Sequence, residues 1–251
     1  MKKIKLRNIN TKAPKETDKA ASKRELDALQ NELFSLQHLF YAAHSYSLLI
    51  VFQGIDTSGK DSTIRNVFSG VDPLGIQATS FKAPCDMERE HDYMWRIFQK
   101  LPEKGMIQIF NRSYYEDVLV PTVQKTIPGN IVEQRYDFIN AFENHLLNNK
   151  TIILKFFLHI SKNEQKKRIQ ERLNDPIKKW KYSSEDIKSS KKWNEYTNAY
   201  EQILNRCSPE IPWVIVPADN KWFRNYIVAS TVVSRLKQLN LKYPTKSQGN
   251  D

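Results

Sequence analysis

A glycine-bounded segment in the first quarter of the chain carries the residue types that bind phosphate. The run Gly54-Ile-Asp-Thr-Ser-Gly-Lys60 matches the pattern G-x-x-x-x-G-K. Its glycines let the backbone curl so that several N–H groups point at one anion, and Lys60 adds a full positive charge. A helix that begins near Lys60 adds the partial positive charge of its first turn. The run therefore predicts a phosphate-binding loop, with Gly54, Ser58, Gly59 and Lys60 as its contacts.

The residue after Lys60 departs from the usual pattern, which has a metal-binding Ser or Thr there. Asp61 takes that place, and the hydroxyls follow as Ser62 and Thr63, so these three residues are retained as candidate phosphate contacts. Within the loop, a bare carboxylate at Asp56 costs about 3 kcal/mol when it lies ~5 Å from a phosphate charge at an effective dielectric of ~20. A divalent cation that bridges Asp56 to the phosphates removes this cost. The alternative is that Asp56 caps the loop by bonding its own backbone.

A second candidate cluster lies in the stretch Phe110-Asn-Arg-Ser-Tyr-Tyr-Glu-Asp117. Kinases with a phosphate-binding loop place an acid and an arginine beside it, and Arg112 is suited to neutralise the transferring group. Glu116 stands three residues after Ser113, so a capping box that only fixes a helix start is an alternative for it. Asp117 is the better metal-linked acid, with a favourable interaction with the helix dipole as its alternative. The catalytic candidates are Asp56, Lys60, Arg112 and Asp117.

The elements that position these residues follow from the pattern of apolar runs, which alternate with helical stretches. This alternation is typical of an α/β sheet with crossover helices. Leucine and phenylalanine recur at steps of three and four over about residues 16–44, which predicts an amphipathic helix. The predicted strands are Ser47–Phe52, Gln77–Phe81, Met106–Phe110, Ile152–Leu158 and Trp213–Val216. We therefore expect a three-layer α/β fold with a five-stranded parallel sheet between two layers of helices.

The composition is that of an ordinary globular domain, with 251 residues of which 40% are hydrophobic and 27% charged. A chain of this length buries about 70–75% of its unfolded surface around one core. No apolar run approaches the ~18 residues that cross a bilayer, and the basic N-terminus lacks the apolar segment of a secretory signal. We therefore expect a cytoplasmic protein. The two cysteines and five histidines show no metal-ligand spacing, which disfavours a zinc enzyme.

The net charge of +11 is concentrated in two segments. Residues 1–24 carry nine Lys/Arg and two acids, and residues 160–192 carry eleven Lys/Arg and five acids. We expect a basic flexible arm over residues 1–15, one domain over 16–243 and a flexible tail over 244–251. The second basic segment lies inside the domain, so a polyanionic ligand is an alternative there to a merely solvated face.

The second basic segment contains a predicted helix with too few apolar residues to bury a face. The only apolar residues between Ser161 and Asn174 are Ile169 and Leu173. Arg168 and Arg172 stand four residues apart on one face, where they can close over substrate phosphates in a lid over about residues 161–190. The alternative for each arginine is a surface ion pair with a neighbouring acid.

Four separated motifs resemble those of the type-2 polyphosphate kinases, and the resemblance covers roughly residues 25–243. The motifs are Gly54-Ile-Asp-Thr-Ser-Gly-Lys60, Phe81-Lys-Ala-Pro84, Asn111-Arg-Ser-Tyr-Tyr-Glu-Asp-Val-Leu-Val120 and Asp175-Pro-x-Lys-x-Trp-Lys181. The resemblance implies a P-loop kinase-like fold with a helical lid. It further implies that Mg²⁺, with Mn²⁺ as a substitute, supports phosphoryl transfer between inorganic polyphosphate and nucleotides. A homodimer or homotetramer is the oligomeric state that it implies.

The resemblance also implies roles for single residues by their position in the motifs. These are Asp56 and Asp117 for holding Mg²⁺, Glu116 as a further metal candidate, Lys60 and Arg112 for gripping the transferring phosphate, and Lys82 for the path of the phosphate chain. The chain departs from the family at two positions. Asn111, a further candidate substrate contact, stands where some relatives have aspartate, and Asp61 stands where they have glycine. These departures leave the preferred acceptor open.

We therefore expect reversible transfer of the terminal phosphoryl group of polyphosphate to ADP or GDP, with AMP to ADP as a further reaction. An ATP-dependent nucleoside or nucleoside-monophosphate kinase is the alternative, because it shares this fold but needs no long cationic track. A nucleic-acid-binding protein would use the two basic segments but leaves the loop over residues 54–60 unexplained. The expected partners are polyphosphate and purine nucleotides, with no specific nucleic acid and no membrane.

Overall fold

Five parallel strands form one sheet at the centre of the molecule. The structure is a computed structural model that describes residues 3–177, 189–207 and 210–245. The strands are β1 (Ser47–Gln53), β2 (Ile76–Ser80), β3 (Ile107–Asn111), β4 (Thr151–His159) and β5 (Trp213–Pro217). Their order across the sheet is β2-β3-β1-β4-β5, and every pairing is parallel. The predicted sheet is confirmed, and each predicted strand agrees with the observed one to within one residue at each end.

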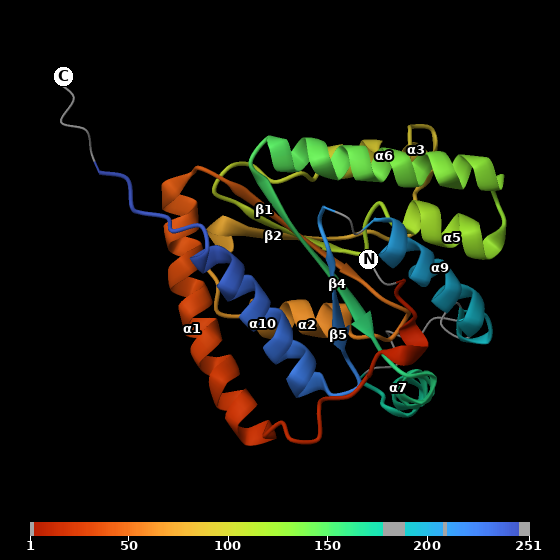
Figure 1. Cartoon of the computed structure of the whole chain (residues 1–251), viewed down its shortest axis with the longest axis horizontal. Coiled ribbons are helices and arrows are strands. Elements are labelled where there is room, and N and C mark those ends of the chain that lie inside the picture. Colours follow the sequence, from red (N-terminus) through yellow and green to blue (C-terminus); the bar gives the residue numbers. More distant parts are fainter. Residues whose placement is uncertain (1–2, 178–188, 208–209, 246–251) are drawn as a thin grey trace.

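Helices cover both faces of the sheet (Figure 1). One face is covered by α1 (Lys19–Ala43), α2 (Lys60–Val67) and α10 (Lys221–Lys237), and the other by α5 (Glu116–Gln124), α6 (Gly129–Asn148) and α9 (Trp193–Arg206). The remaining elements are η1 (Leu6–Asn8), η2 (Pro73–Gly75), α3 (Asp86–Arg89), α4 (Trp95–Phe98) and α7 (Lys162–Asn174). Within the described residues, none of the helices has the length and apolarity that a membrane span requires.

The central strand β1 determines where the phosphate-binding loop lies. All seven of its residues are buried, and alternate side chains enter the cores on the two faces of the sheet. A strand covered on both faces has a nearly continuous apolar sequence, as this one does. The register pairs Phe52 with Asn111 of β3 and Gln53 with Phe157 of β4. The loop after β1 therefore leaves the sheet between the ends of two neighbouring strands, where open α/β sheets bind ligands.

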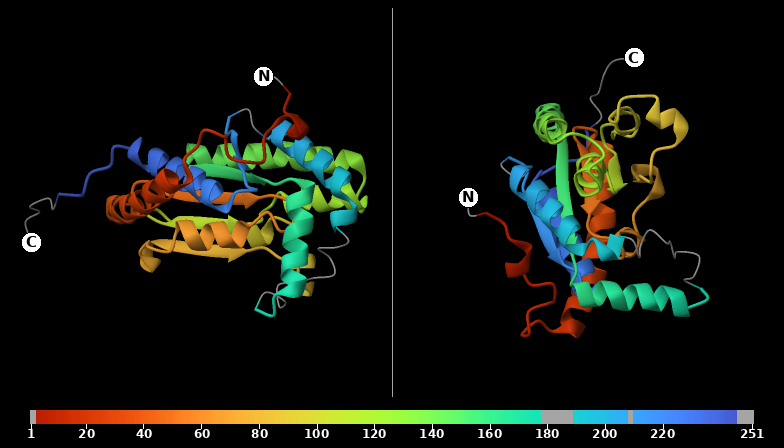
Figure 2. Two further views of the ribbon diagram at one scale, coloured as in Figure 1. Left: turned by 90° about the horizontal axis from the view of Figure 1, so that it is seen from below. Right: turned by 90° about the vertical axis from the view of Figure 1, so that its right-hand side faces the viewer.

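Helix α7 follows β4 and projects from the body of the molecule (Figure 2). The Ser161 hydroxyl caps it by accepting a hydrogen bond from the Glu164 N–H at 3.1 Å, as the spacing of these two residues indicates. Only three of its residues, Gln165, Arg168 and Ile169, are buried. The predicted lid over about residues 161–190 includes residues 178–188, which lie outside the described part, so its closure stays a prediction.

The basic N-terminal segment is docked on the domain, which differs from the flexible arm expected for residues 1–15. Leu6 is 1% exposed and belongs to the core that includes α9. The N–H groups of Ile4 and Leu6 donate to the side chains of Asn205 and Glu201 on α9, at 2.7 and 2.8 Å. One buried leucine and two side-chain acceptors form no periodic pattern, so the sequence alone shows only the charges of this segment.

The same segment also contacts the turn between β5 and α10. The Thr11 hydroxyl donates to the Asp219 carboxylate at 2.8 Å, and the Asp219 N–H donates to the Thr11 carbonyl at 2.9 Å. The Ala13 N–H donates to the side chain of Asn220 at 3.0 Å. Because Asn220 is the N-cap residue of α10, the N-terminal segment restrains the start of that helix.

Replacing Leu6 by alanine tests whether this docking stabilises the protein. Deleting a fully buried leucine side chain removes apolar burial and leaves a cavity, so Leu6→Ala should lower the free energy of unfolding by about 2–4 kcal/mol. Lys5→Ala is the matched control, because Lys5 is 44% exposed in its ion pair with Glu201. The control should lose less than about 1 kcal/mol. Urea unfolding measures both, and equal losses would contradict the docking.

Candidate active site

The phosphate-binding loop is formed at the carboxyl end of β1, and its two glycines are required by its geometry. A Cβ on Gly54, whose φ is 150°, would lie 2.7 Å from the carbonyl oxygen of Leu158. Gly59 has a φ of 104° and is the N-cap residue of α2, which begins at Lys60. The Lys60 ammonium donates to the Gly54 carbonyl at 2.7 Å. The lysine side chain therefore folds back over the loop that precedes it.

Two buried hydroxyls of the loop have no hydrogen-bond partner among the described residues. They are the Oγ1 of Thr57 and the Oγ of Ser58. Thr57 also has a φ of 68°, which is unusual for a β-branched residue. By contrast, the hydroxyls of Ser62 and Thr63 donate to the Gly59 carbonyl, each at 2.9 Å. Since buried hydroxyls normally find a partner and strained backbone clusters at functional sites, both features of Thr57 fit an anion-binding loop.

Arg112 and Asp56 form an ion pair beside the loop. Arg112 is the first residue after β3, with a φ of 62°, and its Nη2 lies 2.7 Å from the Asp56 Oδ1. The Ser189 hydroxyl donates to the other carboxylate oxygen at 3.0 Å. Burial raises the pKa of Asp56, but the cations of Lys60 and Arg112 and the serine hydrogen bond outweigh it and hold this pKa below its ordinary value. Asp56 is therefore an ionised carboxylate between two cations.

Glu116 is a second carboxylate at the loop. Helix α5 begins at this residue without a side-chain cap, so the capping box considered for Ser113 and Glu116 does not form. With its amide oriented to match donors and acceptors, Gln53 at the end of β1 donates to Glu116 at 3.0 Å. Burial raises the pKa of Glu116, although the two cations that flank Asp56 oppose the shift. The structure thus places Glu116 within the charged cluster of the loop.

Asp117 follows Glu116 but has different neighbours. Its Oδ2 lies 3.7 Å from the Nη2 of Arg96, and Arg135 donates to its backbone carbonyl at 2.6 Å. Burial raises the pKa of Asp117 to about 6, and the charges of the two arginines only partly offset this effect. Among the described residues its ion pair is with α4 and not with the loop. The catalytic, metal-binding role of Asp117 therefore stays a prediction that these contacts do not support.

The two positions that depart from the family pattern are in contact with each other. The Asn111 amide, at the end of β3, donates to the Asp61 carboxylate in the first turn of α2 and to the Ser80 hydroxyl at the end of β2. An aspartate at position 111 would have no N–H to donate to Asp61. The two departures are therefore chemically matched. Lys82 lies beyond the end of β2 with an exposed side chain, as its predicted place on the path of a phosphate chain requires.

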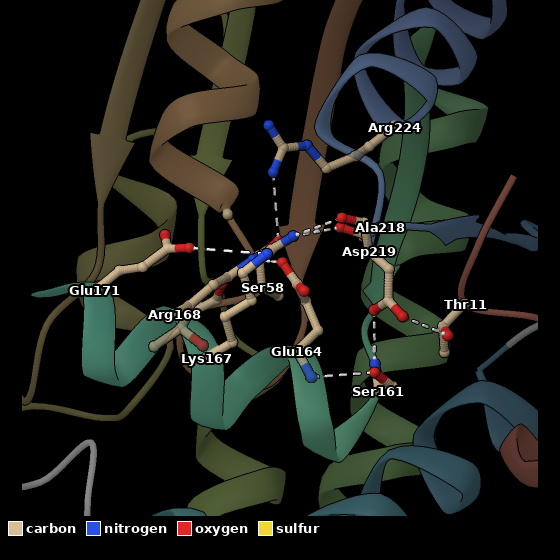
Figure 3. Close-up of polar contacts among 12 residues, drawn as sticks. Thr11, Ser58, Ser161, Glu164, Lys167, Arg168, Glu171, Ala218, Asp219 and Arg224 are labelled. Atoms are coloured by element: carbon tan, nitrogen blue, oxygen red, sulfur yellow. Dashed lines mark hydrogen bonds and ion pairs between the residues drawn. The ribbon is translucent and has the colours of Figure 1, made fainter. Parts of the chain in front are cut away.

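Arg168 contacts the loop from its backbone side (Figure 3). Its guanidinium donates to the carbonyls of Thr57, Ser58, Ala218 and Asp219, at 3.0, 2.9, 2.7 and 3.2 Å, and to the Glu164 carboxylate at 2.8 Å. This differs from the predicted contact of Arg168 with substrate phosphates, because protein acceptors already use its N–H groups. Arg172, in the last turn of the same helix, is half-buried.

A buried polar network holds the turn between β3 and α5. The hydroxyls of Tyr114 and Tyr115 both donate to Glu143 of α6, each at 2.7 Å. The Lys155 ammonium of β4 donates to the same carboxylate at 2.6 Å and to the Tyr115 hydroxyl at 3.0 Å. Because a buried ion pair must keep its hydrogen bonds to offset desolvation, this network restrains the turn that presents Arg112.

Several residues that contact the loop were not predicted from the sequence. Thr57 lies inside the motif, so its hydroxyl could have been predicted from the sequence as a contact of the phosphate. Tyr200 of α9, whose hydroxyl accepts from the Gly54 N–H at 3.3 Å, reaches the loop only through the tertiary structure. Arg224 of α10, which donates to the Ser62 hydroxyl at 3.0 Å, had a weak signal, because it stands one turn into a helix that follows a predicted strand.

The carboxylate oxygens at the loop are suitable ligands for a hard divalent cation that phosphate groups also help to bind. Among the described residues, no cluster of three or more His, Cys, Asp or Glu side chains could hold a metal ion. Asp56 and Glu116 supply two carboxylates that interact electrostatically with each other and with the same cations. Sites of this type typically use one or two carboxylates together with substrate phosphates and water. Phosphoryl transferases typically work with such a divalent metal.

Residues 16–244 match the family model described as Polyphosphate kinase 2 (PPK2). The chain is 44% identical to the AMP/ADP-polyphosphate phosphotransferase of Meiothermus ruber, over 91% of this chain and 86% of the relative. It is 41% identical to the ADP-polyphosphate phosphotransferase of Rhodopseudomonas palustris, over 84% of this chain and 78% of the relative. The crystal structure of polyphosphate kinase 2 from Arthrobacter aurescens TC1 matches with a TM-score of 0.94 and 38% identity, covering 100% of this chain and 91% of that one.

The raised pKa of Asp117 should make stability depend on pH. Its carboxyl binds a proton more tightly in the folded state, with a pKa of about 6, than at the ordinary value of 3.8. Its stabilising contribution is therefore fully present below pH ~4 and is lost as the pH rises through ~6, by up to about 3 kcal/mol. Asp117→Asn should abolish this loss. Urea unfolding from pH 4 to pH 8 tests it, and parallel curves for the variant and the wild type would disagree with this account.

Proposed function

This chain belongs to the polyphosphate kinase 2 family, and we propose that it transfers the terminal phosphoryl group between inorganic polyphosphate and nucleotides in both directions. The observation that carries the proposal is the convergence of Lys60, Arg112 and Asp56 on a glycine loop, two of whose hydroxyls have no partner among the described residues. The proposed acceptors are ADP and GDP, with AMP to ADP as a further reaction. The names of the two relatives, which include AMP and ADP, support the adenine nucleotides, and GDP stays a prediction.

The residues around the loop would act through position and charge. The loop N–H groups and the first turn of α2 suit one phosphate group, and Lys60 and Arg112 add two positive charges beside it. The transferring phosphoryl group spreads negative charge over its equatorial oxygens in the transition state, where such cations stabilise it most. The acceptor is a phosphate oxygen that is already ionised, so no strong general base is required. Holding donor and acceptor in line then supplies the remaining rate enhancement.

The proposed metal is Mg²⁺, with Mn²⁺ as a substitute, and its proposed protein ligands are Asp56 and Glu116. When bound, the metal would neutralise charge on the phosphate oxygens. Asp56 is ionised at neutral pH, and Glu116 lies close enough for its carboxylate to affect the pKa of Lys60 and Arg112. Asp117 remains the alternative ligand that the family resemblance implies.

Lys82 and Arg172 are the proposed contacts of the polyphosphate chain, since Arg168 is bonded to backbone carbonyls. The names of the relatives favour polyphosphate over ATP as phosphoryl donor, so an ATP-dependent nucleoside or nucleoside-monophosphate kinase is the less supported alternative. The expected homodimer or homotetramer, the cytoplasmic location and the absence of a specific nucleic-acid partner stay predictions.

Incubation of the purified protein with polyphosphate, Mg²⁺ and separate samples of AMP, ADP and GDP tests the proposed function. Separation of the products should show ADP from AMP, ATP from ADP and GTP from GDP. Lys60→Ala is the control, because loss of the ammonium should lower kcat by at least about 100-fold with the fold intact. Nucleotide products from ATP but none from polyphosphate would favour the alternative kinase. No product from any donor would refute the proposal.

Three single substitutions compare the carboxylates as metal ligands. Asp56→Asn and Glu116→Gln each remove a carboxylate at the loop, so each should cut kcat by about 100-fold or more and raise the Mg²⁺ concentration needed. Asp117→Asn is the matched control at the neighbouring position and should leave the Mg²⁺ requirement within about threefold of the wild type. Titration of activity against Mg²⁺ provides the measurement. A larger effect at Asp117 than at Glu116 would restore Asp117 as the ligand.

A further inference from the structure

Arg224 is a buried arginine whose guanidinium lies directly behind the phosphate-binding loop. It stands in the first turn of α10 and is 1% exposed. Its Nη2 donates to the Ser62 hydroxyl at 3.0 Å, and its Nη1 donates to the Ser58 carbonyl at 3.5 Å. The side-chain oxygen of Asn225 accepts from Nε and Nη2 at 3.1 and 2.9 Å. Figure 3 shows Arg224 and Arg168 approaching Ser58 from two different elements.

The charge of Arg224 has no acidic partner within 4.0 Å among the described residues. Of the buried lysines and arginines there, only Lys60 shares this property, and it too borders the loop. Arg168, by contrast, pairs with Glu164 at 2.8 Å. Burial lowers the pKa of Arg224 to about 9, and the Arg168 cation contributes to the shift, so the group stays charged at neutral pH. A buried, unpaired cation is costly unless an anion binds close to it.

The backbone of the loop is fitted to this arginine. A Cβ on Gly59 would lie 2.0 Å from the Nη1 of Arg224, so the glycine leaves the space that the guanidinium fills. Gly59 directly precedes Lys60, the first residue of α2. With the Ser58 carbonyl directed at two guanidinium groups, the Gly59 N–H of the same planar trans peptide points the opposite way, where it can meet a phosphate.

We propose that Arg224 is a positioning residue for the phosphate group bound by the loop. It fixes the Ser58 carbonyl and the Ser62 hydroxyl, and a phosphate in the loop supplies the anionic counterpart that its charge lacks among the described residues. Arg224 touches no reacting atom in this arrangement and acts through the loop. This inference rests on the proposed function, because a phosphate must bind there. It also explains why Arg224 is kept in a buried position without an acid beside it in the part of the chain that the structure describes.

The inference predicts that removing Arg224 affects the stability of the unliganded protein and its affinity for phosphate differently. The desolvation cost of an unpaired buried charge opposes the stability that the hydrogen bonds of Arg224 contribute, so Arg224→Gln should change the melting temperature of the unliganded protein only slightly. The same removal should weaken phosphate binding, because the anion then loses a favourable long-range charge interaction. A residue with a purely structural role would show the reverse, with lower stability and normal affinity.

Tripolyphosphate is a suitable probe, since it carries the required charge and needs no nucleotide or turnover. Isothermal titration at constant ionic strength should show affinity at least about tenfold weaker for Arg224→Gln, and within about threefold of the wild type for Arg224→Lys, which keeps the charge. Arg235→Gln is the matched control, because it removes the same charge from the other end of α10, about 16 Å further along the helix. Its affinity should equal that of the wild type.

Each outcome bears on the inference. Unchanged affinity in a folded Arg224→Gln protein would overturn it, and so would equal losses for Arg224→Gln and Arg224→Lys, because charge would then not matter. A melting temperature of unliganded Arg224→Gln well below that of the wild type, or failure of this variant to fold, would make the role structural and also overturn it. If the wild type binds no tripolyphosphate but makes ATP from polyphosphate, only the inference fails. If it does neither, the proposed function fails as well.

Discussion

The geometry of the loop depends on where its carbonyl oxygens point. A loop that offers several N–H groups to one anion must turn the carbonyls of the same peptides away, and those oxygens need donors of their own. Here the donors are guanidinium groups: Arg168 takes the carbonyls of Thr57 and Ser58, and Arg224 approaches the Ser58 carbonyl from α10. Charged donors form stronger hydrogen bonds than neutral ones. The loop conformation therefore rests on cations held by helices that are distant in the sequence.

The buried charges fall into two groups with different physical consequences. Lys155 with Glu143, and Arg168 with Glu164, are paired within the protein, and their hydrogen bonds fix the position of the elements that carry them. Lys60 has no such pair among the described residues, and burial together with the Arg112 cation lowers its pKa. An anion at the loop would relieve that repulsion. The paired charges thus position the site, whereas the unpaired ones in addition favour a negatively charged ligand.

The sequence predicted the sheet and the loop because both are local patterns. Five apolar runs and a glycine motif between strand and helix carry their own geometry, independent of distant contacts. Which of the two acids, Glu116 or Asp117, lies at the loop is not determined by a local pattern. Neighbouring residues in a helix point about 100° apart, and which one meets the loop depends on how the turn is anchored. That anchor is Glu143, a residue of α6 that no motif marks.

Residues whose effect depends on tertiary contacts were mispredicted or missed for the same reason. Arg168 has the helical spacing of a phosphate contact, and only the packing of α7 against the loop shows that carbonyls use its donors. The family departures at Asn111 and Asp61 looked like two separate changes in the sequence, yet they form a single hydrogen bond. Considered alone, either departure suggests a change in the preferred nucleotide acceptor. Considered together, Asn111 and Asp61 form one connection between the end of β3 and the first turn of α2.

The turn between β5 and α10 joins three distant parts of the chain. The N-terminal segment bonds to Asp219 and Asn220, α7 sends Arg168 to the carbonyls of Ala218 and Asp219, and α10 begins there with Arg224 in its first turn. Both arginines then reach Ser58. A displacement of this turn would move both arginines at once. Arg168 donates to its carbonyls, and Arg224 stands in the helix that begins at its end. The docked N-terminal segment, at first sight a charged arm, therefore restrains the support of the phosphate-binding loop.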